Sequence, residues 1–478
     1  MKILHDDRKY CIILAFLTIT GLILRFYSID SNSIWLDEAI TWNISGLPVP
    51  VIWQAVMNDN NPPLFYFIEH IMLQFGNSEL ILRLIPAIAG SMTIPAFYFL
   101  GKEFHSRGIG VVAAALLAFS SYHLFYSQEA RAYSVLLLIF SISLIFYFKA
   151  FQTNSLQHWM LCGFFSAVAC WLHYTAFPVI IFLFLFAVAR MVYKEHGGFS
   201  TLKPVILAAT FSLIIVAPMI ILAIHSLHSK LSSPLTWGFK GYQLITEIFQ
   251  QFLGNIFGKN EIIVVILCLL CLIGLYQLYR TDREKFLFFF LGIAIPILAG
   301  YFLSTKMPTD PRYFILILPF LFLAISVCLI SFQEAIIKPA FPVIALIIVI
   351  MISIPPLLQY YSAGSECGRE KCAEDWRGFS DELQAYAHEG DIIIVIPSYY
   401  RWPLNYYYNN STENTIEFGK STTKDLENIL ASNNTSRKLF FVLGNIEVND
   451  PTGELISWIK AHTTFIRQNG RISLYGIP

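Results

Sequence analysis

The chain has 478 residues, of which 56% are apolar, 15% aromatic and only 13% charged. Soluble domains carry about 25% charged residues, so this chain has roughly half the usual charge. Residues 1–360 contain 38 of the charged residues and residues 361–478 contain 26, which is ordinary for a soluble domain. A formal net charge of +0 without a basic block argues against nucleic acid as a partner. The composition therefore predicts a polytopic α-helical membrane protein with a water-soluble tail.

Long apolar runs predict about eleven membrane-crossing helices, because a helix needs about 20 mostly apolar residues to cross the hydrocarbon. The first run ends at Arg25, which resembles an interfacial anchor, and no small-residue cleavage site follows it, so we expect it to remain uncleaved. The predicted spans are residues 10–27, 82–100, 108–125, 132–149, 158–173, 175–193, 204–224, 261–279, 286–303, 313–332 and 339–357.

Basic residues indicate the orientation of these spans, since they concentrate on the cytoplasmic side. With the N-terminus inside, thirteen basic residues face inward and eight face outward before the tail. We therefore expect a multi-pass protein of the cell membrane, with a cytoplasmic N-terminus and an extracytoplasmic C-terminal domain. The predicted domains are a transmembrane domain at residues 1–360, with a first outward loop at 28–80, and the tail at 361–478.

The first outward loop contains two adjacent carboxylates, Asp37 and Glu38, in the apolar stretch WLDEAITW. Carboxylates in half-buried apolar surroundings are costly unless they are paired or functional. A catalytic pair and a pair that caps an interfacial helix both fit the spacing.

Further polar residues lie at the other outward turns. A guanidinium offers a planar fork that matches phosphate oxygens, so the set predicts a cavity for an anionic, lipid-linked substrate. Taken singly, a basic residue at a helix end more often lays its stem on apolar surface with its charge in water. The candidate substrate-binding residues are Arg83, Glu129, Arg131, His173, Tyr174, Lys306 and Arg312.

The cysteines do not predict a metal site. Six of the eight lie in apolar runs and are expected to be small core residues. A disulfide between Cys367 and Cys372 fits an oxidising exterior, and two free thiols fit the sequence equally well. No metal-binding cluster is predicted, and a requirement for a divalent metal stays open.

The tail is expected to be a small α/β domain. Asp375 to His388 has a helical pattern, and DIIIVIP and KLFFVLG are typical of buried strands. No catalytic constellation is evident in the tail, so acceptor binding or a structural lid is its expected role.

Six motifs occur in an order that resembles a known family: WLDEA, NNPPL, RLIPAIAG, YSQEARAYS, HYT and DPRYFILILPFL. They resemble the glycosyltransferase family 39-like branch of the C-type membrane glycosyltransferases, which includes protein O-mannosyltransferases and lipid A aminoarabinose transferases. The resemblance spans most of residues 20–400 and includes the start of the tail, EDWRGFSDELQAYAHEG.

The resemblance implies a polyprenyl-phosphate sugar as donor and a protein, lipid or glycan acceptor at the outer membrane face. In relatives the Asp of the acidic pair is the catalytic base, which here is Asp37, and Glu38 matches its neighbour. Asn60 and Asn61 stand where some relatives have a charged residue before the two prolines.

The chemistry fits this role, because an acceptor hydroxyl is a weak nucleophile that needs one carboxylate base. The lipid phosphate leaves as a stable anion, so the second carboxylate of glycoside hydrolases is not required. Direct displacement inverts the anomeric carbon. The alternative is a non-catalytic transporter or export component for lipid-linked glycans, which the lack of matched internal repeats disfavours. The sequence leaves the sugar and the acceptor open.

Overall fold

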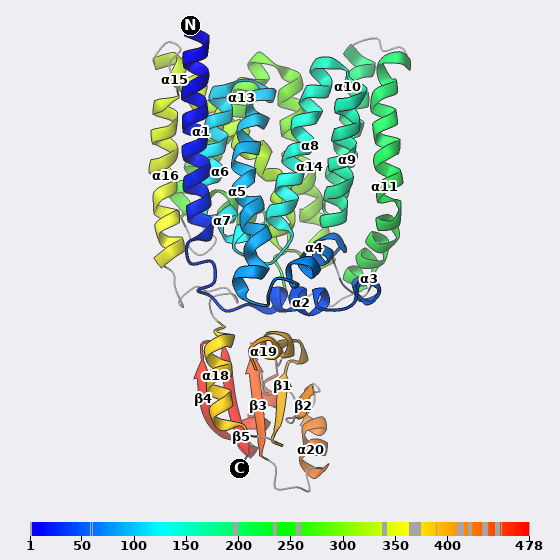
Figure 1. Cartoon of the computed structure of the whole chain (residues 1–478), viewed down its shortest axis with the longest axis vertical. Helices are drawn as coiled ribbons and strands as arrows, with labels where there is room; N and C mark the ends of the chain where they lie inside the picture. Colours follow the sequence, from blue (N-terminus) through cyan, green and yellow to red (C-terminus); the bar gives the residue numbers. More distant parts are fainter. Residues whose placement is uncertain are drawn as a thin grey trace. The chain divides into compact units, whose positions relative to one another are not determined.

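The chain folds into two compact units in the computed structural model (Figure 1). The first unit comprises Met1–Tyr27, Leu47–Asn77 and Ile81–Ser362, and the second comprises the remaining segments Ser28–Gly46, Ser78–Leu80 and Ala363–Pro478. The structure describes residues 2–57, 59, 61–194, 199–232, 237–254, 260–336, 342–362, 374–388, 390–408, 415–418, 423–432, 438–444, 450 and 452–477.

Three residues discussed above, Asn60, Cys367 and Cys372, lie outside the described ranges.

The first unit is a bundle of long apolar helices that run roughly side by side (Figure 1). Within the described ranges, nine helical spans are long and apolar enough to cross a membrane. They are α1 (Lys2–Phe26), α5 (Glu79–Phe104), α8 (Tyr133–Thr153), α10 (Ala176–Lys194), α11 (Phe199–Ser232), α13 (Glu261–Thr281), α14 (Arg283–Leu303), α15 (Leu318–Ile336, with the 3₁₀ turn Pro311–Ile317 before it) and α16 (Val343–Ser362).

Two further predicted spans take other forms. The helices α6 (Arg107–Ala118) and α7 (Ser121–Ser127) make a tenth span if they are counted as one helix bent by 64°. The helix α9 (Leu156–Leu172) is apolar but shorter than the others. All eleven predicted ranges therefore fall on apolar helices, and the predicted polytopic helical fold is confirmed.

A buried arginine accounts for the bend between α6 and α7. Arg25 is fully buried, so the expectation that it anchors α1 at the interface is wrong. Its guanidinium donates to the Leu117 oxygen at 3.2 Å and the Ala118 oxygen at 3.4 Å, and it lies 2.8 Å from Nδ1 of His123. Carbonyls at the end of a helix lack intrahelical partners, so these bonds stabilise the break.

The helix α15 forms the centre of the bundle. Its span is 89% buried, against 17% for the outermost helices α1 and α16. Small residues allow its neighbours to approach closely: a Cβ on Gly274 of α13 would lie 1.9 Å from the Ala324 oxygen of α15. Close contact at small residues is typical of helix packing in membranes.

The second unit contains a five-stranded sheet in the order β2-β1-β3-β5-β4. The strands β2 and β3 run parallel to β1, whereas β5 runs antiparallel to β3 and β4. Both β1 and β3 are buried along their whole length, as their continuous apolar runs predict. The strands are β1 (Ile392–Ile396), β2 (Thr415–Phe418), β3 (Leu439–Gly444), β4 (Thr464–Asn469) and β5 (Ile472–Ile477).

The second unit also contains helices. They are α18 (Trp376–Tyr386), α19 (Arg401–Tyr407), α20 (Thr423–Ser432) and α22 (Glu454–His462), together with α2 (Leu36–Ser45) from the first outward loop. The predicted small α/β domain is thereby confirmed. The rest of that loop, with α3 (Val49–Met57) and α4 (Leu64–Met72), belongs to the helical bundle.

Candidate functional site

Three cationic side chains gather around His173, which ends α9 in the helical unit. Electrostatic contacts join His173 to Lys230, Arg131 and Arg312. Arg131 lies in the turn between α7 and α8, Lys230 lies near the end of α11, and Arg312 lies in the 3₁₀ turn before α15. We call these four residues the basic cluster. The sequence predicted three of its members, and the structure brings them together.

Aromatic rings support the basic cluster. The ring of His173 packs between Tyr133 and Tyr313, with centroid distances of 5.5 and 5.6 Å. The Lys230 ammonium lies 5.1 Å from the Tyr313 centroid, and the Arg312 guanidinium lies 5.8 Å from the centroids of both tyrosines. Aromatic faces attract cations without neutralising them. Arg312 also lies 3.7 Å from Oδ1 of Asp310, so one of the three cations has a carboxylate beside it.

His173 contributes no charge to the cluster at neutral pH. Burial, followed by the charges of Lys230, Arg131 and Arg312, lowers the pKa of His173 well below its usual value. Nδ1 of His173 lies 2.8 Å from Oγ1 of Thr175, which fixes the ring. The positive charge therefore rests on the two arginines and the lysine, which are groups suited to phosphate oxygens.

A carboxylate that the sequence analysis missed, Asp59, lies beside the cluster. Its Oδ2 accepts hydrogen bonds from the Tyr66 hydroxyl at 2.5 Å and from Nδ2 of Asn61 at 3.2 Å. Electrostatic contacts join Asp59 to Lys230 and to Tyr174. The sequence signal was its position directly before the NNPPL motif.

Tyr174 presents a neutral hydroxyl at this site. Burial, and after it the charge of Asp59, raises the pKa of Tyr174, so the phenol stays protonated. Its buried hydroxyl has no hydrogen-bond partner within the part of the chain that the structure describes. A buried hydroxyl without a partner is costly, and a ligand oxygen would satisfy it.

Two hollows adjoin the basic cluster. Asn61, Tyr66, Arg131, Tyr133 and His173 help to line a small one. An apolar groove of about 120 Å³ lies between α10, α14 and the turn before α15. The groove is lined by residues that include Thr175, Phe182, Ile295, Tyr313 and Leu316. Because Thr175 and Tyr313 also contact His173, the groove leads directly to the charges.

The remaining predicted binding residues have different surroundings. Arg83 in α5 and Glu129 in the turn after α7 are buried, and both side chains have interaction partners. Lys306 is exposed in the turn after α14. The described contacts do not include these three in the basic cluster, and their part in substrate binding stays a prediction.

Asp37 and Glu38 lie at the start of α2, in the second unit. Glu38 is fully buried, and its Oε2 accepts a hydrogen bond from the Trp35 amide at 3.4 Å, which forms part of a capping box. Asp37 is only partly buried. Asp37 is therefore the carboxylate of the pair that an outside group can approach.

Side chains of the tail hold the segment that leads into α2. The Tyr407 hydroxyl accepts a hydrogen bond from the Ile34 amide at 2.7 Å and donates to Oε1 of Glu79 at 2.7 Å. Arg377 donates to the same Glu79 oxygen at 2.6 Å and to the Asp30 carbonyl at 2.8 Å. The tail and the segments Ser28–Gly46 and Ser78–Leu80 are thus one folded unit, which fixes the position of α2 within it.

Within the described ranges, no group of three or more His, Cys, Asp or Glu side chains is placed to hold a metal ion.

Comparisons with known proteins agree with this architecture. Residues 59–222 match the family model described as dolichyl-phosphate-mannose-protein mannosyltransferase. No curated protein sequence matches the chain.

Three solved structures are similar in fold. ArnT from Cupriavidus metallidurans in the apo state has a TM-score of 0.65 at 11% identity, and its complex with undecaprenyl phosphate has a TM-score of 0.62 at 12%; each covers 97% of both chains. The oligosaccharyltransferase AglB from Archaeoglobus fulgidus, in complex with an inhibitory peptide and a dolichol-phosphate, has a TM-score of 0.56 at 13% identity, covering 98% of this chain and 74% of AglB. The family match over residues 59–222 and this fold both support the predicted superfamily.

Proposed function

We propose that this chain, a multi-pass membrane protein of the C-type glycosyltransferase superfamily, transfers a sugar from a polyprenyl-phosphate donor to a protein, lipid or glycan acceptor. One observation carries the proposal: the basic cluster lies at the end of an apolar groove. A polyprenyl-phosphate sugar is an apolar chain that ends in a phosphate, so its two parts match the two parts of this site. The undecaprenyl phosphate bound by ArnT and the dolichol-phosphate bound by AglB support the same class of donor.

In the proposed reaction the acceptor hydroxyl attacks the anomeric carbon of the sugar. The new C–O bond forms as the bond between that carbon and the phosphate oxygen breaks, which inverts the anomeric configuration. Asp37 takes the proton of the hydroxyl, and the polyprenyl phosphate leaves as an anion. Arg131, Lys230 and Arg312 bind the phosphate and stabilise the charge that develops on it, which is electrostatic catalysis.

Donor binding tests the phosphate contacts. Arg131→Lys and Arg312→Lys each keep the charge but lose the planar fork, so we expect each to weaken binding of a polyprenyl-phosphate sugar by roughly tenfold, the loss of one charge-assisted hydrogen bond. Arg83→Lys tests the third predicted arginine in the same assay. Arg280→Lys, at an exposed position at the end of α13, is the matched control. Unchanged donor affinity in all three test variants would contradict phosphate binding by these arginines.

Sugar transfer separates the enzyme from the alternative of a transporter. In the first experiment, the purified full chain in lipid vesicles is given polyprenyl-phosphate sugars whose sugar is labelled. In the second, mass analysis of cell-surface glycans and glycolipids from cells with and without the protein identifies the acceptor. An enzyme releases polyprenyl phosphate and labels an acceptor. Movement of intact donor across the vesicle membrane without its cleavage would contradict the proposed function.

A further inference from the structure

A second charged cavity lies at the opposite end of the helical bundle from the basic cluster. It has a volume of about 310 Å³ and opens between the ends of α5, α8, α10 and α14. Gln152, which lines it, is nineteen residues along α8 from Tyr133, which packs against His173, or about 29 Å at 1.5 Å per residue. The cavity therefore takes no part in the reaction proposed above.

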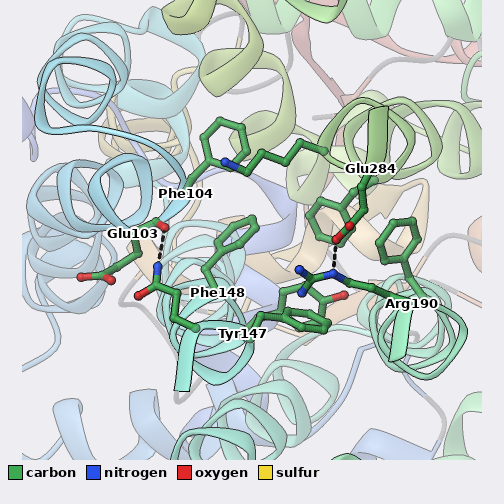
Figure 2. A pocket seen from close by; sticks show the side chains of 11 residues that line it. Glu103, Phe104, Tyr147, Phe148, Arg190 and Glu284 are labelled. Atoms are coloured by element: carbon green, nitrogen blue, oxygen red, sulfur yellow. Dashed lines mark hydrogen bonds and ion pairs between the residues drawn. The ribbon is translucent and has the colours of Figure 1, made fainter. Parts of the chain in front are cut away.

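The cavity has aromatic walls and a mouth with charges of both signs (Figure 2). Tyr147 and Phe148 lie between Glu103 on one side and the ion pair of Arg190 with Glu284 on the other. The Arg190 guanidinium stacks 3.9 Å from the Phe151 centroid, and it bonds Glu284 through Nε, which leaves its terminal amino groups for a ligand.

Charged groups of both signs line the mouth. On one side, the Lys285 ammonium lies 5.0 Å from the Phe104 ring centroid and 3.9 Å from Oδ2 of Asp282, and it adds a second cation to Arg190. On the other side, the Glu103 carboxylate lies 3.9 Å from the half-buried Lys149 ammonium. An ion pair of that length near the surface contributes little and is readily replaced. A purely anionic ligand would meet two carboxylates here, and a purely cationic one would meet Arg190 and Lys285.

We propose that this cavity binds the headgroup of a zwitterionic phospholipid of the phosphoethanolamine type. Arg190 and Lys285 would bind its phosphate, and Glu103 and the aromatic walls would bind its ammonium. Large apolar side chains on the adjoining faces of α10 and α14, including Leu185, Val192, Leu287 and Phe290, are exposed and provide a surface for the acyl chains. Pockets between helices at a membrane interface are established places for lipid headgroups.

Native mass spectrometry of the delipidated full chain, titrated with short-chain phosphatidylethanolamine and phosphatidylglycerol, tests this site. We expect phosphatidylethanolamine to bind more tightly. Glu103→Gln and Lys285→Gln should each weaken it about tenfold, the loss of one charge-assisted hydrogen bond. Only Lys285→Gln should also weaken the binding of phosphatidylglycerol. The control is Glu334→Gln, an exposed carboxylate at the same end of the bundle, on α15.

Two results would overturn the proposal. One is tighter binding of phosphatidylglycerol than of phosphatidylethanolamine, and the other is unchanged phosphatidylethanolamine binding in both variants. Neither substitution changes Arg190 or Glu284, so both members of this ion pair are present in both variants. Thermal unfolding of each variant in detergent shows whether it is folded, and having two variants from different helices keeps the test valid if one does not fold.

Discussion

The two adjacent carboxylates of α2, Asp37 and Glu38, have different surroundings and therefore different expected roles. Glu38 is buried and its carboxylate caps the helix through the Trp35 amide, whereas Asp37 is only partly buried on the adjacent position. A proton acceptor must be within reach of the acceptor hydroxyl, so this difference favours Asp37 as the base.

Substitution of the two carboxylates should separate these tasks. Asp37→Asn keeps size and removes basicity, so we expect turnover to fall about 10²–10⁴-fold with donor binding unchanged. Glu38→Ala loses the cap and should cost about 0.5–2 kcal/mol of stability. The measurements are sugar transfer, donor affinity and thermal unfolding, with exposed Asp30→Asn as the control in the same unit. Near wild-type transfer by Asp37→Asn would exclude it as the base.

At the scale of elements, side chains of the tail hold α2 in position. The Tyr407 hydroxyl and Arg377 meet at Glu79 and hold the residues directly before α2. The sequence predicted an α/β domain there because DIIIVIP and KLFFVLG are plain strand signals. It could not predict the pairing of the tail with the loop, since contacts between residues about 300 or more apart leave no local pattern.

Tyr407→Phe tests this support. The change removes one hydroxyl and two hydrogen bonds, so we expect a stability loss of about 1–3 kcal/mol and lower turnover at unchanged donor affinity. The measurements are kcat, donor affinity and the midpoint of thermal unfolding. Tyr386→Phe, at an exposed position of α18, is the control. If Tyr407→Phe lowers donor affinity as strongly as turnover, the hydrogen bonds of Tyr407 affect donor binding and do not act through the position of α2.

The break between α6 and α7 is a second feature of the helices that the sequence did not predict. Hydropathy predicted one uninterrupted span at 108–125, because it registers apolar content and not the hydrogen bonds that Arg25 makes across the bundle. For the same reason hydropathy did not place Lys230 at the site. The predicted apolar span ends at residue 224, but α11 continues to Ser232 and brings the lysine to the basic cluster. Hydropathy marks where a helix leaves the hydrocarbon, and side-chain contacts decide where it ends.

Removal of the Arg25 guanidinium should therefore destabilise the bundle. Arg25→Met leaves the Leu117 and Ala118 carbonyls without this donor, and unsatisfied buried groups cost about 1–3 kcal/mol each. We expect a lower thermal unfolding midpoint in detergent and weaker donor binding, because the turn that carries Arg131 follows α7. Arg8→Met, at an exposed position on the same helix, should change neither. An unchanged midpoint for Arg25→Met would show that other contacts hold the bend.

At the scale of the whole molecule, the number of crossings links the two ends of the bundle to the two sides of the membrane. Lys285 lies at the start of α14, and α14, α15 and α16 follow it before the tail. Three crossings put residue 285 and the tail on opposite sides, whichever way the protein is inserted. The excess of basic residues at the Lys285 end predicts that this end faces the cytoplasm, since such residues favour that side.

Reporter fusions test both steps of this argument. A reporter after Lys285 should be active in the cytoplasm and one after Pro478 should be active outside it, because the basic cluster and the tail would then face an external acceptor. Equal activity of both reporters on one side would contradict the count of three crossings. The reverse pattern would keep the count but invert the protein, and it would place the basic cluster at the cytoplasmic face, where a sugar transferred to an external acceptor could not originate.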